Sequence, residues 1–336
     1  MHMVATNKKL TAHPANPEAV EMAAIRDGYG KGLVKAGEQD ERIVVLCADL
    51  TESTRSHWFA ERFPNRFIEV GVAEQNLAVI ASGMAAAGKI PFISSYATFS
   101  PGRNNEQIRT NICINNMPVK IAGAHAGISV GPDGATHQAL EDIALMRVLP
   151  RMVVIVPCDA IEAEKATVAA AGNGQPTYLR LGREKTPIIT TQKSPFIIGK
   201  AETLRSPPAG GGDVAIIACG TLVYEALVAA AALAKEKIGC TVINNHTVKP
   251  MDEETIIAAA QQCGAVVTAE EHQIAGGMGS AVAEVLARNF PVPIEFVGMQ
   301  NRFGESGSPT ELMQAFGLTS EGIIDAVRRV LKRKVS

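Results

Sequence analysis

Short apolar runs alternate with segments of helical spacing along most of the chain. The run at 42–48 (R-I-V-V-L-C-A) is nearly continuous, as expected of a strand buried on both faces of a parallel sheet. Similar runs occur at 67–70, 90–94, 119–124, 152–156 and 177–181. Between them, helices are predicted at 56–62, 73–87, 103–115, 137–147 and 160–171. This alternation predicts a doubly wound α/β sheet.

A second α/β unit follows a break in the pattern. Residues 188–212 contain S-P-P-A-G-G-G-D and predict a linker or exposed loop. Beyond it, strands are predicted at 214–218, 241–244, 265–269 and 293–297, and helices at 222–237, 252–262, 278–289 and 320–333. We therefore expect a flexible arm over 1–16, a first domain over 17–187 and a second over 213–336. Asn16-Pro17-Glu18 is a good start for the first helix, which is predicted to reach Ala36.

The composition narrows the class of protein. The chain has 336 residues, 46% of them hydrophobic and 20% charged, with a net charge of −2. This is typical of a soluble globular protein and argues against binding to nucleic acid or a membrane surface. No apolar run approaches the ~20 residues of a membrane helix, and the first residues lack the apolar core of a signal peptide. The six cysteines form no C-x-x-C pair, so we expect no zinc site or redox motif, and a cytoplasmic location.

The stretch 68–76 (I-E-V-G-V-A-E-Q-N) is the centre of the candidate chemistry. It joins a strand to a helix of small and apolar residues, A-E-Q-N-L-A-V-I-A-S-G-M-A-A-A-G, which is therefore predicted to be buried. Glu74 lies in the first turn, where an anion is favoured. Taken alone, it could be an ordinary N-terminal helix acid. However, it also faces the carboxyl ends of the strands, where open α/β sheets bind ligands.

G-V-A-E-Q-N followed by a Gly/Ala-rich helix resembles the pyrimidine-binding domain of thiamine-diphosphate-dependent transketolases. The resemblance extends over residues 17–335. It implies that Glu74 hydrogen-bonds the N1′ atom of the aminopyrimidine of thiamine diphosphate. A carboxyl group there drives the tautomerisation by which the cofactor's 4′-amino group removes the proton from its thiazolium C2. Exclusion of water strengthens such a hydrogen bond.

Two aromatic residues offer a shelf for the pyrimidine ring. Tyr96 and Phe99 lie three residues apart after a predicted strand, in a chain with only 4% aromatic residues. Packing in the core is the alternative for this pair. In the resembling family this loop holds the pyrimidine, although Gly102 stands where a further aromatic often occurs. Asp49, at the end of the first strand, is a second carboxylate that could lie near the cofactor.

The segment 125–137 (H-A-G-I-S-V-G-P-D-G-A-T-H) is a glycine-rich loop between a strand and a helix. Two histidines and an aspartate in such a loop favour function over structure. The resemblance implies that His125 contacts the sugar phosphate, and that Asp133 and His137 contact sugar hydroxyls. His137 is also a catalytic candidate, together with Glu74. A metal site built from the three residues is the alternative.

Phosphate binding favours forked cations and hydroxyl groups. Arg26, Ser53 and Arg183 match the positions that contact phosphate in the resembling family. Arg180, in the same L-R-L-G-R string, is a near neighbour that could be confused with Arg183.

One expected part is absent from the sequence. Transketolases carry a preceding domain, marked by G-D-G…N, that binds the diphosphate and Mg2+, and this chain contains no G-D-G. The resemblance therefore implies the C-terminal subunit of a split transketolase. An N-terminal subunit would supply the Mg2+ ligands, and the pair would move a two-carbon ketol unit between sugar phosphates. A homodimer or heterotetramer is expected.

Other readings share some of these features. A 1-deoxyxylulose-5-phosphate synthase fragment and the β subunit of a 2-oxo-acid dehydrogenase use the same cofactor and an A-E-Q motif. The 125–137 loop favours the sugar-phosphate enzymes over the oxo-acid ones. A scaffold without activity is the third reading, and the retained acid, histidines and arginines argue against it. G-G-M-G-S at 276–280 does not have the spacing of a dinucleotide-binding loop.

Overall fold

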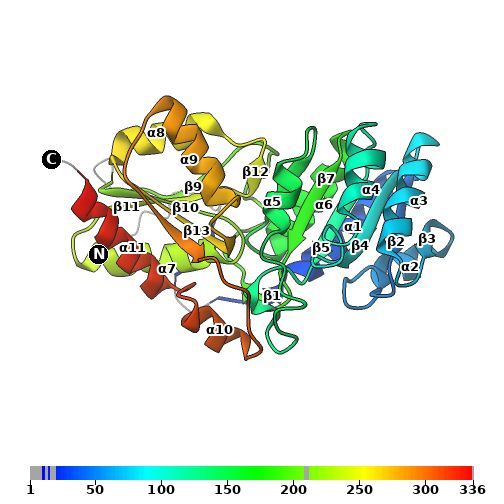
Figure 1. The fold of residues 1–336 in the computed structure, drawn as a ribbon, viewed down its shortest axis with the longest axis horizontal. Helices are drawn as coiled ribbons and strands as arrows, with labels where there is room; N and C mark the ends of the chain where they lie inside the picture. The colour runs from blue at the N-terminus through cyan, green and yellow to red at the C-terminus, as the bar shows by residue number, and fades with distance from the viewer. Residues whose placement is uncertain (1–9, 12–13, 16–19, 208–211, 335–336) are drawn as a thin grey trace.

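A computed structural model of the chain describes residues 10–11, 14–15, 20–207 and 212–334. Two α/β halves lie next to each other along the longest axis, the first coloured blue to green and the second yellow to red (Figure 1). Each half has a sheet with helices packed against it, which confirms the predicted α/β class.

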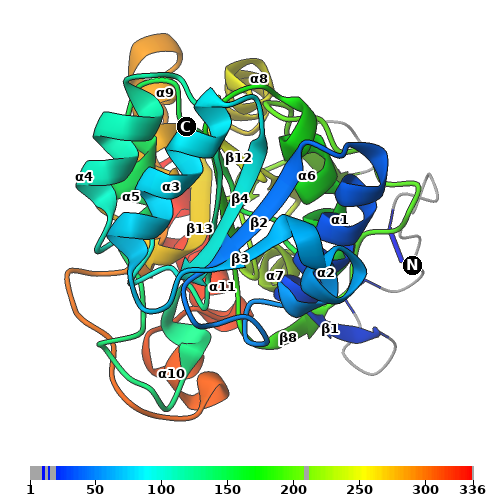
Figure 2. The ribbon, with the colours of Figure 1, turned by 90° about the vertical axis from the view of Figure 1, so that its right-hand side faces the viewer.

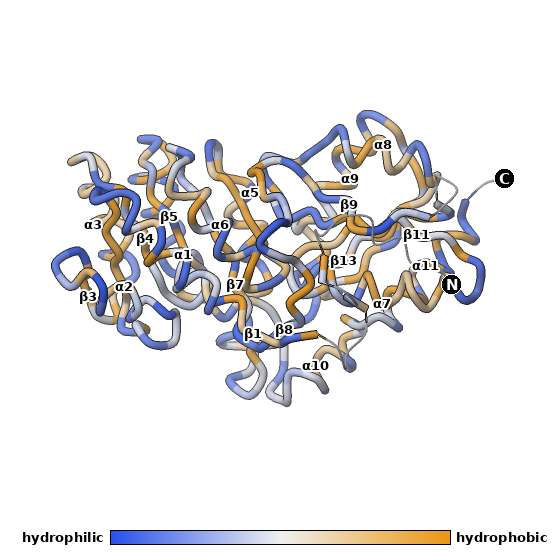
Figure 3. The backbone as a smooth tube through the Cα atoms, turned by 180° about the vertical axis from the view of Figure 1, so that it is seen from behind, coloured by the Kyte–Doolittle hydropathy of each residue, from blue (hydrophilic) through white to orange (hydrophobic). Residues whose placement is uncertain are grey.

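The first sheet has seven strands, and most of its residues are buried. The strands are β2 (Ile43–Cys47), β3 (Phe67–Glu69), β4 (Ile90–Tyr96), β5 (Lys120–Ala124), β6 (Val153–Ile155), β7 (Thr177–Leu181) and β12 (Thr247–Lys249). Their order is β12-β6-β7-β5-β4-β2-β3, parallel throughout except for β12. Every residue of β2, β5, β6 and β7 is buried, which explains the continuous apolar sequences of β2 and β6. The charged residues Lys120 in β5 and Arg180 in β7 are buried with hydrogen-bond partners. Figure 3 shows hydrophobic (orange) stretches mainly in the interior of the two halves and hydrophilic (blue) stretches mainly on their outer loops.

Helices cover both faces of the first sheet (Figure 2). The helices of this half are α1 (Ile25–Gln39), α2 (His57–Arg62), η1 (Pro64–Arg66), α3 (Glu74–Ala86), α4 (Asn105–Gln107), η2 (Ile108–Cys113), η3 (Ile128–Val130), α5 (Asp142–Arg147) and α6 (Ala160–Gly172). Helices α1 and α6 cover one face, and α3, α4 and α5 the other. The α1–α6 contact is close, because a Cβ atom on Gly28 would lie 1.9 Å from the carbonyl oxygen of Ala160.

The first helix begins later than predicted. It starts at Ile25, because Met22–Ala24 instead forms β1, which pairs antiparallel with β8 (Lys185–Pro187). The predicted helix start at Asn16-Pro17-Glu18 lies outside the described residues.

Two further predicted helices differ from the structure. The one at 103–115 is divided into α4 and the π-helix η2. The one at 137–147 is only formed from Asp142, because the residues before it continue the glycine-rich loop.

The second sheet has five strands in the order β14-β13-β10-β11-β9. These are β9 (Glu202–Arg205), β10 (Val214–Ala218), β11 (Cys240–Asn244), β13 (Val266–Gln273) and β14 (Ile294–Met299). The helices of this half are α7 (Leu222–Lys235), α8 (Glu253–Cys263), α9 (Met278–Asn289), α10 (Pro309–Ala315) and α11 (Ser320–Arg333). Strand β9 lies within 188–212, so part of the segment expected as a linker pairs with β11.

The two halves share one packed core. Strand β12 belongs to the second half of the sequence, but it pairs with β6 at the edge of the first sheet. The largest cluster of buried apolar residues contains Ile121 and Val154 from the first half together with Ile217 and Ile243 from the second. The second half therefore supports the first sheet directly. No helix in the described ranges is both long and apolar enough to cross a membrane.

Candidate functional site

The candidate residues gather at the carboxyl ends of the strands of the first sheet. Asp49 and Ser53 follow β2, Glu74 follows β3, Tyr96 ends β4, His125 follows β5 and Arg183 follows β7. Parallel strands bring their carboxyl ends to one edge, which is where ligands bind in open α/β sheets.

Arg26, Arg183 and His125 form a cationic group, in which the two arginines carry the positive charge. Arg26 Nη1 donates to the carbonyl oxygen of Ser53 at 2.9 Å and lies 3.3 Å from His125 Nε2. Because a guanidinium can only donate, His125 Nε2 is the acceptor and the ring proton is on Nδ1. That Nδ1–H has no hydrogen-bond partner among the described residues. His125 is thus a buried neutral imidazole with a spare donor.

Burial, and then the charges of Arg26 and Arg183, lower the pKa of His125 to about 3. Burial and the charge of Arg55 also lower the pKa of Arg26. Arg183 Nη1 donates to the carbonyl oxygen of Val130 at 2.5 Å, within the 125–137 loop. Several cations around a neutral donor are the arrangement that an anion such as phosphate would stabilise.

Four rings form a continuous set beside this group. Tyr96 stacks on His125 with ring centroids 3.9 Å apart, and Phe99 is 6.1 Å from Tyr96. His137 lies edge-on to Phe99 at 5.4 Å and to Tyr96 at 6.3 Å. Tyr96 and Phe99 are only partly buried, so they form a platform at the edge of the sheet rather than part of the core.

Glu74 lies at the start of α3 with a side chain that is 1% exposed. Its Oε2 accepts a hydrogen bond from Arg103 Nη1 at 2.6 Å, and the Arg103 guanidinium lies 4.7 Å above the Phe99 ring centroid. The Arg103 side chain is 47% exposed. Sequence reasoning did not find Arg103, although it directly follows Gly102 in the aromatic loop.

These residues fit an aminopyrimidine ring. The buried carboxylate of Glu74 is paired with the half-exposed Arg103, whose guanidinium lies over the face of Phe99. The backbone itself requires glycine at position 102, since a Cβ atom there would lie 2.0 Å from the carbonyl oxygen of Thr98. The further aromatic found in the resembling family would not fit this backbone.

Among the contacts of the described residues, none joins Asp133 or Asp49 to the other candidates. Asp133 is exposed on its loop, and Asp49 is exposed with its backbone N–H donating to Glu69 Oε1 at 2.7 Å. In the described part of the chain, no three His, Cys, Asp or Glu side chains are arranged to hold a metal ion.

Arg180 and Arg183 have different surroundings. Arg180 is 6% exposed, and its Nε donates to Asp142 Oδ2 at 2.8 Å. The Tyr178 hydroxyl donates to the same oxygen at 2.6 Å. Arg180 is therefore engaged in a buried network, whereas Arg183 is partly exposed at the site.

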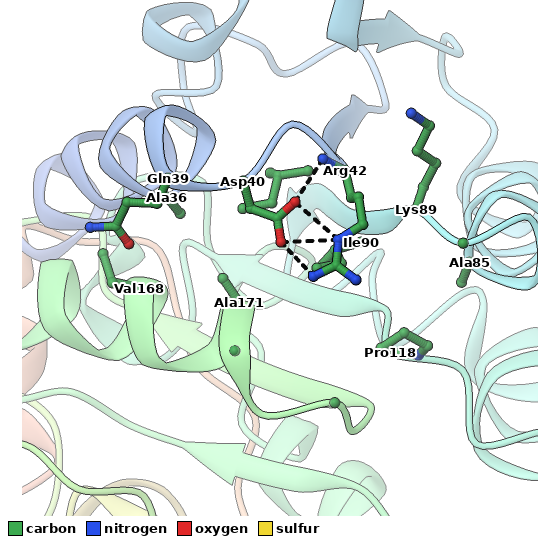
Figure 4. A pocket seen from close by; sticks show the side chains of 14 residues that line it. Ala36, Gln39, Asp40, Arg42, Ala85, Lys89, Ile90, Pro118, Val168 and Ala171 are labelled. Atoms are coloured by element: carbon green, nitrogen blue, oxygen red, sulfur yellow. Dashed lines mark hydrogen bonds and ion pairs between the residues drawn. The ribbon is translucent and has the colours of Figure 1, made fainter.

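A separate hollow of about 480 Å³ lies at the opposite end of the first sheet, where β2 and β4 begin (Figure 4). Asp40 and Arg42 at its wall bind each other, with Arg42 Nη2 2.6 Å from Asp40 Oδ2. None of the candidate residues lines this hollow.

The fold and the site define the class of protein. The family model for the transketolase pyrimidine-binding domain matches residues 21–188, and the model for the transketolase C-terminal domain matches residues 199–323. The chain belongs to the transketolase family, whose enzymes depend on thiamine diphosphate.

Within this family, the chain resembles separately encoded C-terminal subunits. It is 41% identical over 92% of its length to the 6-deoxy-6-sulfo-D-fructose transketolase subunit SqwH of Clostridium sp., covering 95% of that protein. It is 42% identical to a putative transketolase C-terminal section of Methanocaldococcus jannaschii, over 92% of this chain and 97% of that one. A solved structure titled "Split gene transketolase, inactive beta4 tetramer" matches with a TM-score of 0.86 and 45% identity, over 93% of this chain and 99% of that chain.

Proposed function

We propose that this chain is the C-terminal subunit of a two-chain transketolase. With an N-terminal subunit that binds the diphosphate and Mg2+, it would transfer a two-carbon ketol unit from a ketose phosphate to an aldose phosphate. The observation that carries the proposal is the common edge of the first sheet. A buried acid, an aromatic platform and a cationic group lie there together.

Each part has a separate task. Glu74 would hold N1′ of the aminopyrimidine, after Arg103 has moved away, and Tyr96 and Phe99 would contact the ring. When bound, thiamine diphosphate supplies the carbon nucleophile and the electron sink for the transfer. The chain's own residues exclude water from the carboxyl group and orient the ring against it.

The cationic group would bind the charged end of the substrate. Arg26, Arg183 and the neutral His125 can donate to an oxyanion, while His137 and Asp133 would contact sugar hydroxyls. A phosphate and a sulfonate share this chemistry, and one relative is named for a sulfonated sugar. A sulfosugar donor is therefore the second candidate substrate.

The test is reconstitution with a partner that carries G-D-G…N, in the presence of thiamine diphosphate and Mg2+. Phosphorylated and sulfonated ketoses are compared as donors. Glu74→Gln should slow ketol transfer by about a hundredfold or more, because the amide cannot share a proton with N1′. Excess cofactor should rescue it only in part.

Glu106→Gln is the matched control, since this exposed acid accepts hydrogen bonds only from its neighbours Gln107 and Thr110 among the described contacts. It should keep the original rate. Full activity of Glu74→Gln at saturating cofactor would remove the assignment.

A further inference from the structure

The last residues of β13 connect the second domain to the candidate site. The strand continues beyond its predicted end at Ala269 through Glu270, Glu271 and His272, all buried. Successive side chains of a strand point to opposite faces. Glu270 accepts hydrogen bonds from the backbone N–H groups of Met278 (2.6 Å) and Gly279 (2.8 Å), so its contacts stay within the second domain.

Glu271 points the other way, across the boundary between the domains. Its Oε1 accepts the backbone N–H of Ser129 at 2.7 Å, and its Oε2 accepts the hydroxyl of Thr221 at 3.0 Å. Ser129 lies in the 125–137 loop of the first domain, and Thr221 precedes α7 of the second. One carboxylate therefore bridges the two domains.

The loop approaches this carboxylate closely. A Cβ atom on Gly127 would lie 2.2 Å from Glu271 Oε1, and Gly127 has a φ of +93°. A glycine is thus required both by the space and by the backbone conformation. Two residues before it is His125, also in a left-handed conformation with φ +54°. The path of the backbone at 125–129 and the position of Glu271 are therefore mutually dependent.

The second domain also contacts Gly134 of this loop and the residues that follow its end. Gln138 Nε2 donates to the carbonyl oxygen of Glu305 at 2.9 Å. The backbone N–H of Gln273 donates to the carbonyl oxygen of Leu140 at 2.8 Å. Gly134 has no room for a Cβ atom because it would lie 2.5 Å from Ser306 Oγ. The second domain therefore packs against the 125–137 loop and supports its backbone.

A buried carboxylate is a costly way to provide these two acceptors. Burying a charge is unfavourable unless it is well paired, and apolar residues often give equal or greater stability. The two carboxylate oxygens of Glu271 each receive one neutral donor, and the buried Arg180 donates to its backbone carbonyl oxygen at 2.8 Å. Its presence is better explained by the need to reach both sides of the boundary at once.

We propose that Glu271 is a positioning residue: by holding Ser129 and Thr221 together it fixes the 125–137 loop, and thereby sets the affinity for the anionic end of the substrate. It does not touch the substrate. The effect on substrate rests on the function proposed above, whereas the effect on the loop does not.

Two variants separate reach from charge. Glu271→Gln keeps the length of the side chain: its amide oxygen can accept from Ser129, and its NH2 can donate to Thr221. Glu271→Asp keeps the charge but is one methylene shorter and cannot reach both groups. Glu270→Gln is the control, because it weakens contacts inside the second domain without touching the loop.

The first measurement is hydrogen exchange of the amides at 127–131 in the chain alone. Glu271→Asp should speed exchange at Ser129 by about tenfold or more, and Glu271→Gln should leave it unchanged. Glu270→Gln should lower the melting temperature but leave exchange in the loop unchanged. The proposal is overturned if Asp leaves the loop protected or if Gln opens it as much as Asp does.

The second measurement uses the reconstituted complex with two donors. Glu271→Asp should raise the KM for a phosphorylated donor by about tenfold, with kcat and the use of unphosphorylated hydroxypyruvate nearly unchanged. An equal loss on both donors would overturn the link to anion binding. If the unaltered complex transfers no ketol unit, the proposed function fails, while the exchange result still decides whether Glu271 positions the loop.

Discussion

His125 illustrates, at the scale of single residues, how surroundings determine chemistry. It is buried beside Arg26 and Arg183, and its pKa is lowered to about 3. An ordinary histidine, with a pKa of about 6.5, would change its charge near neutral pH. His125 is therefore neutral and can donate a hydrogen bond from Nδ1, while the neighbouring arginines carry the positive charge.

This leads to a prediction on pH. His125→Ala should raise the KM for a phosphorylated donor by about tenfold, because alanine has no side-chain donor and one hydrogen bond to a charged group is lost. A pKa of about 3 leaves His125 neutral above about pH 5. The KM of the variant divided by the KM of the unaltered protein should therefore be constant between about pH 6 and about pH 8. Titration of the substrate phosphate affects both proteins and cancels in the ratio.

The measurement is the KM of both proteins at several pH values across this range. A ratio that falls as the pH rises through about 6.5 would mean that His125 binds as a cation. The sign follows because deprotonation would then remove an attraction that only the unaltered protein has.

Arg183 carries the second prediction. Arg183→Ala should raise the KM for phosphorylated donors by about tenfold to a hundredfold, the cost of one charge-assisted hydrogen bond. It should barely affect hydroxypyruvate, which has no phosphate. Arg183→Lys is the control for its contact with Val130, and should recover part of the affinity. An equal loss on both donors would show that Arg183 supports the loop instead of binding the anion.

Much of the candidate site could be found from short motifs. Tyr96 and Phe99 lie in one string, and His125 and His137 lie in another, so residue type and the ends of strands were enough to place them together. Arg103 and Glu271 could not be found in this way. The role of Arg103 depends on a side chain that reaches across to Glu74, and that of Glu271 on two domains meeting.

At the scale of elements, apolar runs predicted the buried strands well. Strands that contain polar residues, such as the end of β13, or that are very short, such as β12, were not predicted. The sequence predicts that β13 ends at Ala269, but the strand continues through two buried glutamates. Glu270 is satisfied by backbone N–H groups of the following helix, and Glu271 by Ser129 and Thr221, which lie far away in the sequence. β12 has only three residues and is stabilised by pairing with β6 of the other half. Such tertiary pairings leave no local signal in the sequence.

Helix α3 carries a prediction about assembly. Its inner face packs in the core, but Val79 on its outer face is 43% exposed, and Val72, just before the helix, is 70% exposed. Exposed apolar surface of this kind can mark an interface. We expect the purified chain to form a homodimer or a larger oligomer.

Sedimentation of Val79→Glu at micromolar concentration tests this expectation. A buried charge at the contact should shift the protein towards the monomer. Ile197→Glu, at another exposed apolar position that is 62% exposed, should leave the assembly unchanged. A clean monomer for the unaltered chain would contradict the expectation.

At the scale of the whole molecule, both halves of the chain together hold the candidate site in place. Under the proposed function, this site is only half of a complete active site. The shared core and the hydrogen bonds of Glu271 to Ser129 and Thr221 connect the second domain to the 125–137 loop. The sequence nevertheless lacks the G-D-G motif that marks diphosphate and Mg2+ binding in transketolases. Under the proposed function, the chain would bind the pyrimidine and the sugar, and the partner would bind the diphosphate and Mg2+.

The final prediction follows from this division. Alone, the chain can offer thiamine diphosphate one hydrogen bond and ring stacking, each worth about 1 kcal/mol net. Binding must also break the Arg103–Glu74 contact and immobilise the ligand, which costs several kcal/mol. Calorimetry should therefore detect binding weaker than about 1 mM, and no ketol transfer, until the G-D-G…N partner and Mg2+ are added. Micromolar binding to the chain alone would instead reveal a diphosphate site within this sequence.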